Sequence, residues 1–182
     1  MPIFTRDQFV KIASSRAGTK GVRGVVNEVK AFSRSGQTTS IFLSHCHTDK
    51  SIVEDTVAFL RSLNATIYVD WMDETMPQQT TGSTASKIKS RIITNDKFIL
   101  LATNAAIASK WCNWEIGLGD AHKLREDKIC LLPLADSSGR WEGNEYLQIY
   151  PFVETASGYD NIFRLTYPDG KQIWFDDWLK KN

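Results

Sequence analysis

The sequence predicts an α/β protein whose open, parallel sheet is covered by helices on both faces. Short and almost continuous apolar segments recur at Ser40–Leu43, Ala65–Val69, Lys97–Leu101 and Lys128–Leu132, a pattern typical of strands buried on both faces. Segments with helical periodicity separate them. Strands that alternate with helices form right-handed crossovers, which make neighbouring strands parallel.

The composition limits the classes of partner. A chain of 182 residues is long enough for one well-buried domain. The hydrophobic fraction of 42% and the charged fraction of 24% are ordinary for a soluble globular protein. Because 22 basic residues nearly balance 21 acidic ones, no overall field attracts nucleic acid or anionic lipid. We therefore expect neither nucleic acid nor a membrane as a partner.

The N-terminus and the cysteines indicate a cytoplasmic protein. No apolar run reaches the roughly 18 to 20 residues of a membrane span, and Arg6 and Asp7 interrupt any secretory signal. The three cysteines are far apart and form no CxxC pair, so neither disulfides nor a zinc module are predicted. His45-Cys46-His47 resembles a metal cluster, but adjacent residues at a strand end point to opposite sides. No metal site is expected.

Residues 1–38 differ in character from the rest and are predicted to form an accessory extension. Thr5 and Gln8 have capping-box spacing before a helix over Arg6–Ser15, and a second helix is expected over Val25–Phe32. A polar joint, 33–38, separates them from the main domain, 39–182. We expect the extension to contact a partner or a second copy.

The remaining elements follow from local patterns. Asp49 is suited to cap a helix over 49–63, and Ala85, Ile88 and Ile92 form the apolar stripe of the next one. Beyond the core at 39–134, the chain is less regular. A short strand is expected over Tyr150–Glu154, and Pro168-Asp169-Gly170 predicts a turn joining two antiparallel strands over 162–167 and 171–175. One helical turn follows near Asp176–Leu179.

A ligand is expected at the carboxyl ends of the strands, where open parallel sheets bind small molecules. These ends are Ser44-His45, Asp70-Trp71, Thr103-Asn104 and Pro133-Leu134. The loop over 71–82 is longer than the usual connection of about 2 to 6 residues, which favours a binding role over a tolerated surface insertion. Motifs of the Rossmann, P-loop and serine-hydrolase types are absent.

The segment 109–119 contains the candidate catalytic pair. Trp111 and Glu115 are four residues apart and project side by side on a helix that Ser109 or Asn104 can cap. Alternatively, Trp111, Trp114 and Leu118 form a core stripe and Glu115 is solvated. In either case Trp114 is the better candidate for the core. Gly117 and Gly119 each destabilise a helix, which predicts a kink or a close approach of another segment.

Together these segments resemble a bacterial Toll and interleukin receptor (TIR) domain. The resemblance rests on Ile41-Phe42-Leu43-Ser44-His45 followed by Asp49, on Tyr68-Val69-Asp70-Trp71 before the long loop, on Phe98-Ile99-Leu100-Leu101, and on 109–115. It covers roughly Thr39 to Leu134, with every segment in the family's order. It implies a flavodoxin-like fold.

The resemblance also implies a function. Some members cleave NAD+ to nicotinamide and ADP-ribose or a cyclised product, and they carry an essential glutamate four residues after a tryptophan. Glu115 and Trp111 match that pair. By position, the other substrate contacts are Phe42, His45, Asp70, Trp71 and Met76. The His45-Cys46 pair, Pro77 and the late Gly82 depart from the family's usual residues.

The chemistry suits a carboxylate beside an indole. Nicotinamide leaves as a neutral molecule, so the positive charge on the ribose needs stabilisation, and an indole attracts the pyridinium ring. Nearby indoles are expected to desolvate Glu115 and raise its pKa. We therefore predict a TIR-type NAD+ glycohydrolase or ADP-ribosyl cyclase, with NAD+ as substrate and no further cofactor, acting in bacterial antiphage signalling.

Two alternatives remain open. Other TIR domains are non-catalytic scaffolds, which bind further TIR chains or a downstream effector protein through the long loop. A nucleoside deoxyribosyltransferase-like enzyme is the second alternative, since such enzymes also place a glutamate at an anomeric carbon.

Overall fold

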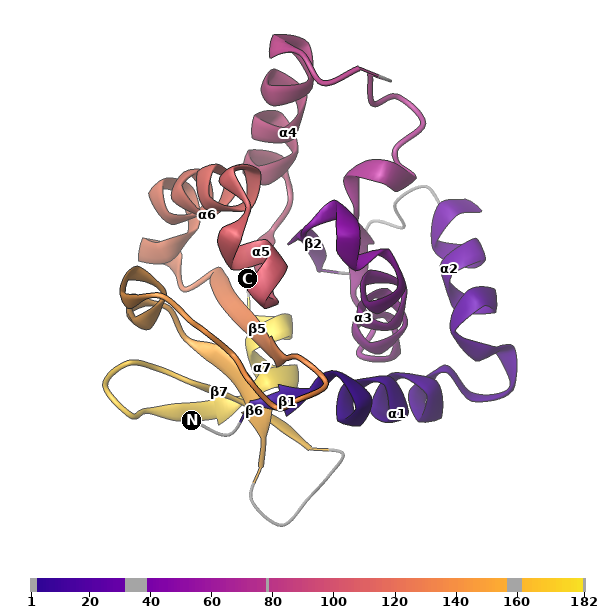
Figure 1. The fold of residues 1–182 in the computed structure, drawn as a ribbon, viewed down its shortest axis with the longest axis vertical. Helices are drawn as coiled ribbons and strands as arrows, with labels where there is room; N and C mark the ends of the chain where they lie inside the picture. Colours follow the sequence, from indigo (N-terminus) through magenta and orange to yellow (C-terminus); the bar gives the residue numbers. More distant parts are fainter. Residues whose placement is uncertain (1–2, 32–38, 78, 157–161, 182) are drawn as a thin grey trace.

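A sheet runs through the centre of the molecule with helices on both faces (Figure 1). The computed structural model describes residues 3–31, 39–77, 79–156 and 162–181. The strands are β1 (Phe4–Thr5), β2 (Ser40–Ser44), β3 (Thr66–Tyr68), β4 (Lys97–Ala102), β5 (Ile129–Ala135), β6 (Phe152–Thr155), β7 (Phe163–Thr166) and β8 (Gln172–Trp174). The α-helices are α1 (Arg6–Ala17), α2 (Gly21–Ala31), α3 (Lys50–Ser62), α4 (Gly82–Thr94), α5 (Asn104–Ala108), α6 (Lys110–Lys123) and α7 (Phe175–Lys180).

The strand order confirms the predicted α/β class. The strands lie in the order β3-β2-β4-β5-β6-β7-β8, with parallel pairing from β3 to β6. The chain passes from β2 to β3 on one side and then returns past β2 to β4. This reversal is the switch point of a flavodoxin-like sheet, where a crevice opens at the carboxyl ends of the strands.

The two faces of the sheet divide the apolar strand residues between two cores. In β2, Ile41 and Leu43 belong to the core beneath α1, α3 and α7, whereas Phe42 belongs to the core beneath α4, α5 and α6. In β4, Ile99 belongs to the first of these cores and Phe98 to the second. Because successive side chains alternate between faces, a sheet covered on both sides needs continuous apolar strands.

The N-terminal segment packs into the first of these cores. The predicted capping box is present, with Thr5 Oγ1 accepting from the Gln8 amide and Gln8 Oε1 from the Thr5 amide. Helix α1 extends to Ala17 and α2 begins earlier than predicted, at Gly21. Phe9 is fully buried, with its ring edge-on to Phe59 of α3, and β1 pairs with β5.

The segment thus belongs to the main core. The domain boundary near residue 39 stays a prediction. Phe32, the end predicted for the second helix, and the joint at 33–38 lie outside the described residues.

The predicted C-terminal hairpin is confirmed and extends the sheet. Strands β7 and β8 pair antiparallel, and β7 pairs antiparallel with β6. The expected helical turn is α7, whose Trp178 is fully buried and donates its indole N–H to the Asp127 carbonyl at 2.8 Å. None of the helices within the described ranges has the length and apolar character of a membrane span.

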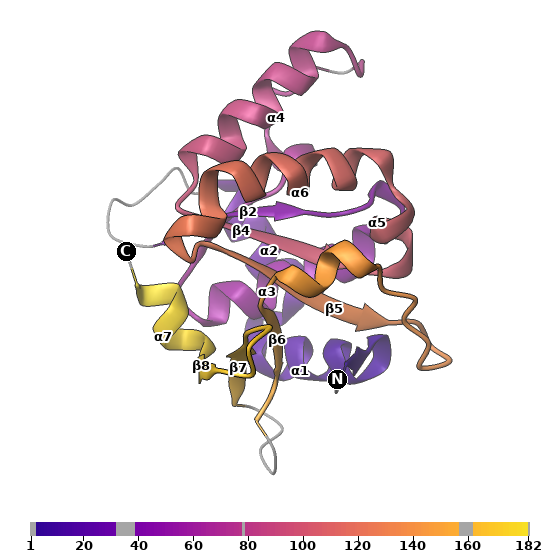
Figure 2. The same cartoon turned by 90° about the vertical axis from the view of Figure 1, so that its left-hand side faces the viewer.

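The two helix glycines have different environments. A Cβ on Gly119 would lie 3.0 Å from the Phe98 ring of β4 and 3.3 Å from Ile129 of β5. The predicted close approach is therefore correct at Gly119, where α6 lies against the sheet. It is wrong at Gly117, which is exposed and where an added Cβ would meet no atom within 4 Å. Figure 2 shows α6 lying over β2 and β4.

This difference predicts opposite effects on stability. Gly117→Ala should raise the free energy of unfolding by about 0.5 to 1 kcal/mol, because alanine restricts the unfolded chain and favours the helix. Gly119→Val should lower it by about 1 to 3 kcal/mol through overpacking against Phe98. Urea denaturation of both variants and the wild type measures the two changes. Equal effects would show that the approach of α6 to β4 is not restrictive.

Candidate active site

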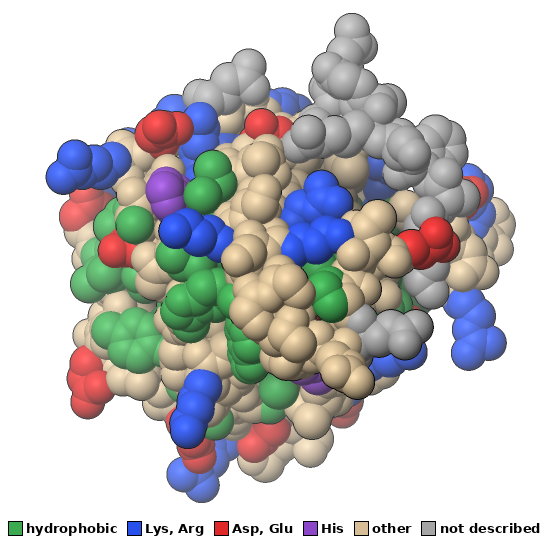
Figure 3. Space-filling view, turned by 90° about the horizontal axis from the view of Figure 1, so that it is seen from above, with side chains coloured by type: hydrophobic (Ala, Val, Ile, Leu, Met, Phe, Trp, Pro, Cys, Tyr) green, Lys and Arg blue, Asp and Glu red, His purple; other side chains and the backbone are tan. Residues whose placement is uncertain are grey.

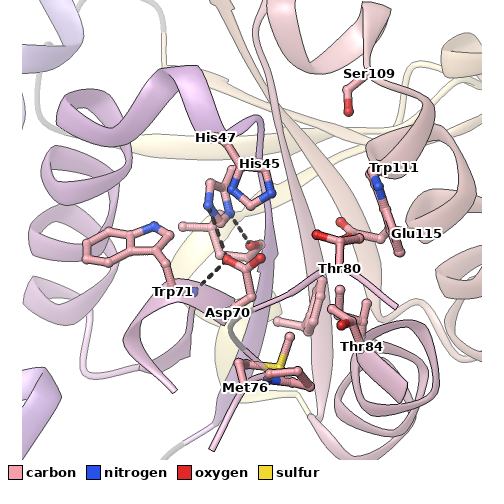
Figure 4. Close-up of a pocket in the computed structure, with 14 residues that line it drawn as sticks. His45, His47, Asp70, Trp71, Met76, Thr80, Thr84, Ser109, Trp111 and Glu115 are labelled. Carbon is pink, nitrogen blue, oxygen red and sulfur yellow. Dashed lines mark hydrogen bonds and ion pairs between the residues drawn. The ribbon is translucent and has the colours of Figure 1, made fainter. Parts of the chain in front are cut away.

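A pocket lies at the carboxyl ends of β2 and β3, between the loop after β3 and the helices α4 and α6 (Figure 4). Its volume is about 220 Å³. It is lined by Phe42, Leu43, His45, His47, Asp70, Trp71, Met76, Pro77, Thr80, Thr84, Ile88, Ser109, Trp111 and Glu115. The structure therefore brings the predicted catalytic and substrate-contact residues to one cavity, whereas the predicted strand ends Thr103-Asn104 and Pro133-Leu134 do not line it.

Helix α6 places Glu115 in this pocket. Its Ser109 cap, one of the two predicted, accepts the Cys112 amide at 3.3 Å. Glu115 is only 7% exposed, on the buried side of the helix. Trp111, one turn earlier, is partly buried at the pocket wall. The assignment of Trp114 to the core is wrong, because its side chain is 38% exposed and its ring lies edge-on to Trp111. The alternative of a solvated Glu115 is also wrong.

A short hydrogen bond holds the Glu115 carboxyl group. Ser44, the last residue of β2, is 1% exposed and donates its hydroxyl to Glu115 Oε2 at 2.5 Å. Burial raises the pKa of Glu115 from its ordinary value of 4.5 to about 8, although the Ser44 hydrogen bond opposes this change. The charge of Asp70 raises the pKa further. The neutral, protonated form of Glu115 is therefore favoured near neutral pH.

His45 and Asp70 form the opposite wall. His45 Nδ1 lies 3.1 Å from the Leu43 carbonyl oxygen, and Nε2 lies 3.4 Å from Asp70 Oδ1. Asp70 Oδ1 also accepts the Trp71 amide at 2.7 Å. Burial lowers the pKa of His45 below 6.5, with Asp70 opposing the shift. Figure 4 shows this pair facing Glu115 across the pocket.

The other predicted contacts are less direct. Phe42 is 2% exposed and stacks between Tyr68 and Phe98, so it forms part of the apolar floor. The Trp71 indole points away from Glu115 in Figure 4, and the Lys50 ammonium lies 5.1 Å from its ring. Met76 lies on the loop side of the pocket.

Asp73 organises the loop after β3. Despite partial burial, hydrogen bonds from Thr75, Arg91 and Tyr68 lower the pKa of its carboxyl group to about 2. Arg91 of α4 reaches Asp73 Oδ2 at 2.8 Å, and the Tyr68 hydroxyl reaches the same oxygen at 3.0 Å. This carboxylate therefore ties the loop to α4 and β3.

Comparison with known proteins identifies the family. The TIR domain family matches the chain over residues 41–161. The chain belongs to the TIR domain family. It is also 26% identical over 149 residues to a Bacillus cereus (strain MSX-D12) protein described as probable 3′ cyclic ADP-D-ribose synthase ThsB′. That alignment covers 78% of this chain and 76% of the relative.

Several contacts of this TIR domain do not follow from sequence reasoning. Ser44 is predicted only as a strand end, but its partner Glu115 is 71 residues away. Asp49 is predicted to cap a helix, yet its side chain makes no cap and instead accepts the Thr103 hydroxyl at 2.6 Å. Thr84 lines the pocket from α4. A polar residue directly after a buried strand is the sequence signal that could have suggested Ser44.

A larger cavity of about 600 Å³ lies elsewhere on the TIR domain. It is lined mainly by aromatic and apolar side chains from β5, β6 and the segment between them. Its two carboxylates, Glu142 and Glu145, are both exposed. Since desolvated ionisable groups mark catalytic sites, the smaller pocket with Glu115 and His45 is the candidate active site.

Burial of Glu115 predicts a pH-dependent stability. Its pKa is higher in the folded than in the unfolded chain, so the folded state binds more protons between about pH 4.5 and 8. The free energy of unfolding should therefore fall as pH rises through this range. Glu115→Gln should exceed the wild type by at least about 1 kcal/mol at pH 8, which is about 2 to 4 °C in Tm, and by less at pH 5. Thermal unfolding at both pH values provides the measurement. A constant difference would contradict the buried carboxyl group.

Proposed function

We propose that this TIR domain cleaves the bond between nicotinamide and ribose in NAD+, with Glu115 as the catalytic carboxylate. The observation that carries the proposal is the buried Glu115 beside Trp111 in a pocket at the switch point of the sheet. The name of the Bacillus cereus relative, which states the synthesis of a cyclic ADP-ribose, supports the same class of reaction. NAD+ is the substrate in this proposal, and no further cofactor takes part.

The arrangement suits the departure of nicotinamide. The pyridinium nitrogen takes the bonding electron pair and leaves neutral, while positive charge develops on the ribose. A carboxylate stabilises that charge most where water is excluded. Because Ser44 bonds Oε2, Oε1 of Glu115 remains to face the anomeric carbon. Trp111 provides an aromatic surface for the pyridinium ring.

Substrate binding also changes the protonation state of Glu115. The surroundings of Glu115 in the protein favour the neutral carboxyl group, since burial raises its pKa to about 8. The cationic nicotinamide ring stabilises the carboxylate in turn. Binding of NAD+ at pH 7 is therefore coupled to release of a proton, and the reactive carboxylate is formed in the complex.

The size of the pocket suggests which part of NAD+ it encloses. Its volume of about 220 Å³ is below the roughly 300 to 1,000 Å³ of sites that enclose a whole small molecule. We assign it to nicotinamide and its ribose, with the ADP portion extending past the loop residues Met76 and Thr80.

We further propose that the domain acts in bacterial antiphage signalling in the cytoplasm and binds other TIR chains or a downstream effector. Two exposed aromatic residues, Trp114 and Tyr146, favour such contacts. Tyr146 donates a hydrogen bond to Asn113, the residue before Trp114, and this bond holds the segment with Tyr146 against α6. Aromatic side chains are enriched where proteins associate. On the face drawn in Figure 3, acidic and basic side chains are interspersed, and the net charge is only +1, so protein is favoured over nucleic acid as a partner.

Loss of Glu115 tests the proposed reaction. Glu115→Gln should reduce nicotinamide release by at least about 100-fold, because the amide cannot neutralise the developing charge. Trp111→Ala should also reduce it, while Trp174→Ala, at an exposed tryptophan of β8 that does not line the pocket, should keep the wild-type rate. Purified proteins are incubated with NAD+ and the products separated by chromatography. Equal release by the wild type and Glu115→Gln would reject the assignment.

Ser44 should set the pH at which the enzyme works. Its hydrogen bond favours the charged form of Glu115, so Ser44→Ala should raise the pKa of Glu115 further. The rise of kcat/KM with pH should then occur at higher pH than in the wild type. Nicotinamide release measured between pH 6 and 9 gives both profiles. A uniform loss without displacement would mean that Ser44 acts only on packing.

A further inference from the structure

The imidazole of His45 has a defined tautomer. A carbonyl oxygen only accepts hydrogen bonds, so the contact of Nδ1 with the Leu43 oxygen at 3.1 Å requires the proton on Nδ1. In the neutral ring, Nε2 then carries a lone pair. The side chain is 3% exposed and lines the pocket.

Nε2 is a buried acceptor without a hydrogen-bond donor among the described residues. It faces Asp70 Oδ1 at 3.4 Å, which is itself an acceptor and is occupied by the Trp71 amide. A buried polar group that lacks a hydrogen-bond partner destabilises the folded state. Nε2 is satisfied when a ligand donates a hydroxyl proton to it from within the pocket.

We propose that His45 is the general base for the hydroxyl that attacks the ribose after nicotinamide leaves. The inference rests on the proposed function and concerns its second step, in which a hydroxyl attacks the ribose. The bond from the anomeric carbon to nitrogen breaks, and a bond from that carbon to the attacking oxygen forms. The proton of this hydroxyl goes to His45 Nε2. Water as acceptor gives the linear product, and a hydroxyl of the substrate's second ribose gives a cyclic one.

The geometry favours His45 over the two neighbouring carboxylates. Glu115 lies on the other wall, and its negative charge is needed at the anomeric carbon until the new bond has formed (Figure 4). Asp70 lies beside Nε2, with Oδ1 at 3.4 Å, where its charge stabilises the imidazolium that proton transfer creates. It holds this position through the Trp71 amide. His45 is thus placed to receive the proton and Asp70 to support it.

The charged groups around His45 agree with a neutral resting state. Burial lowers its pKa more than the charge of Asp70 raises it, and His47, whose ring centroid is 6.1 Å away, also lowers it. Asp49 raises it. A base is most useful when it is unprotonated at the working pH yet able to hold a proton during the reaction.

Two classes of acceptor differ in whether they must lose a proton when they attack the ribose. Water and ribose hydroxyls lose a proton when they attack, so both need His45. A neutral pyridine attacks through a nitrogen lone pair and has no proton to lose. Exchange of nicotinamide for another pyridine should therefore proceed without a base at position 45.

The test compares these acceptors in His45→Gln. Glutamine can fill the site and hydrogen-bond, but it cannot take a proton. Wild type and variant are incubated with NAD+ and 3-acetylpyridine, and products are identified by chromatography and mass spectrometry. We expect hydrolysed and cyclised products to fall at least about 100-fold, while the exchanged dinucleotide forms within a few-fold of the wild-type rate. His122→Gln, at an exposed position, is the control.

Each outcome decides a different point. Equal loss of all products in His45→Gln would assign His45 a packing role, and undiminished hydrolysis or cyclisation would also overturn the proposal. No nicotinamide release by the wild type would reject the proposed function, and with it the role of His45. Nitrogen NMR gives an independent check, because His45 must be neutral at pH 7 with its proton on Nδ1. A protonated ring, or a proton on Nε2, would overturn the proposal whatever the activity.

Discussion

The hydrogen bond between Ser44 and Glu115 is the contact on which the site depends. It joins the end of β2 to the middle of α6, and both side chains are less than a tenth exposed. A buried carboxyl group is costly unless it is protonated or hydrogen-bonded. The fold accepts this cost at the switch point of the sheet, where a crevice is available for a ligand. Stability and reactivity are thus opposed at the same residue.

One face of α6 supports this contact through residues that are spaced four positions apart. Trp111 forms the pocket wall, Glu115 enters the pocket, and Gly119 lets the helix approach β4. Lys123, one turn further, is buried and donates to the Ile93 and Asn95 carbonyls at the end of α4. Because α4 also holds the loop through Arg91 and Asp73, this face of α6 determines the position of both walls beside Glu115.

The sequence predicted those parts of the structure that depend on local pattern. Continuous apolar strands indicated a sheet covered on both faces, and the spacing of Trp111 and Glu115 indicated a shared helix face. Trp114 was misassigned because periodicity defines a stripe but not which side of it meets the sheet, and the small Cys112 and Gly119 mark the buried side. Contacts between distant segments, such as Asp49 with Thr103, could not be predicted because they depend on which strand ends become neighbours.

The two titratable side chains on opposite walls of the pocket, Glu115 and His45, have pKa values that are shifted from their ordinary values in opposite directions. Burial raises the pKa of Glu115 and lowers that of His45, so the neutral form of both side chains is favoured near pH 7. A substrate that carries a positive charge favours the Glu115 carboxylate, and a hydroxyl that loses its proton as it attacks favours the protonated His45. In the proposed reaction, each charge therefore arises only with the step that uses it. The separation of two pKa values by environment is the general means by which one site provides both a carboxylate and a base near neutral pH, and here burial on opposite sides of one crevice produces it.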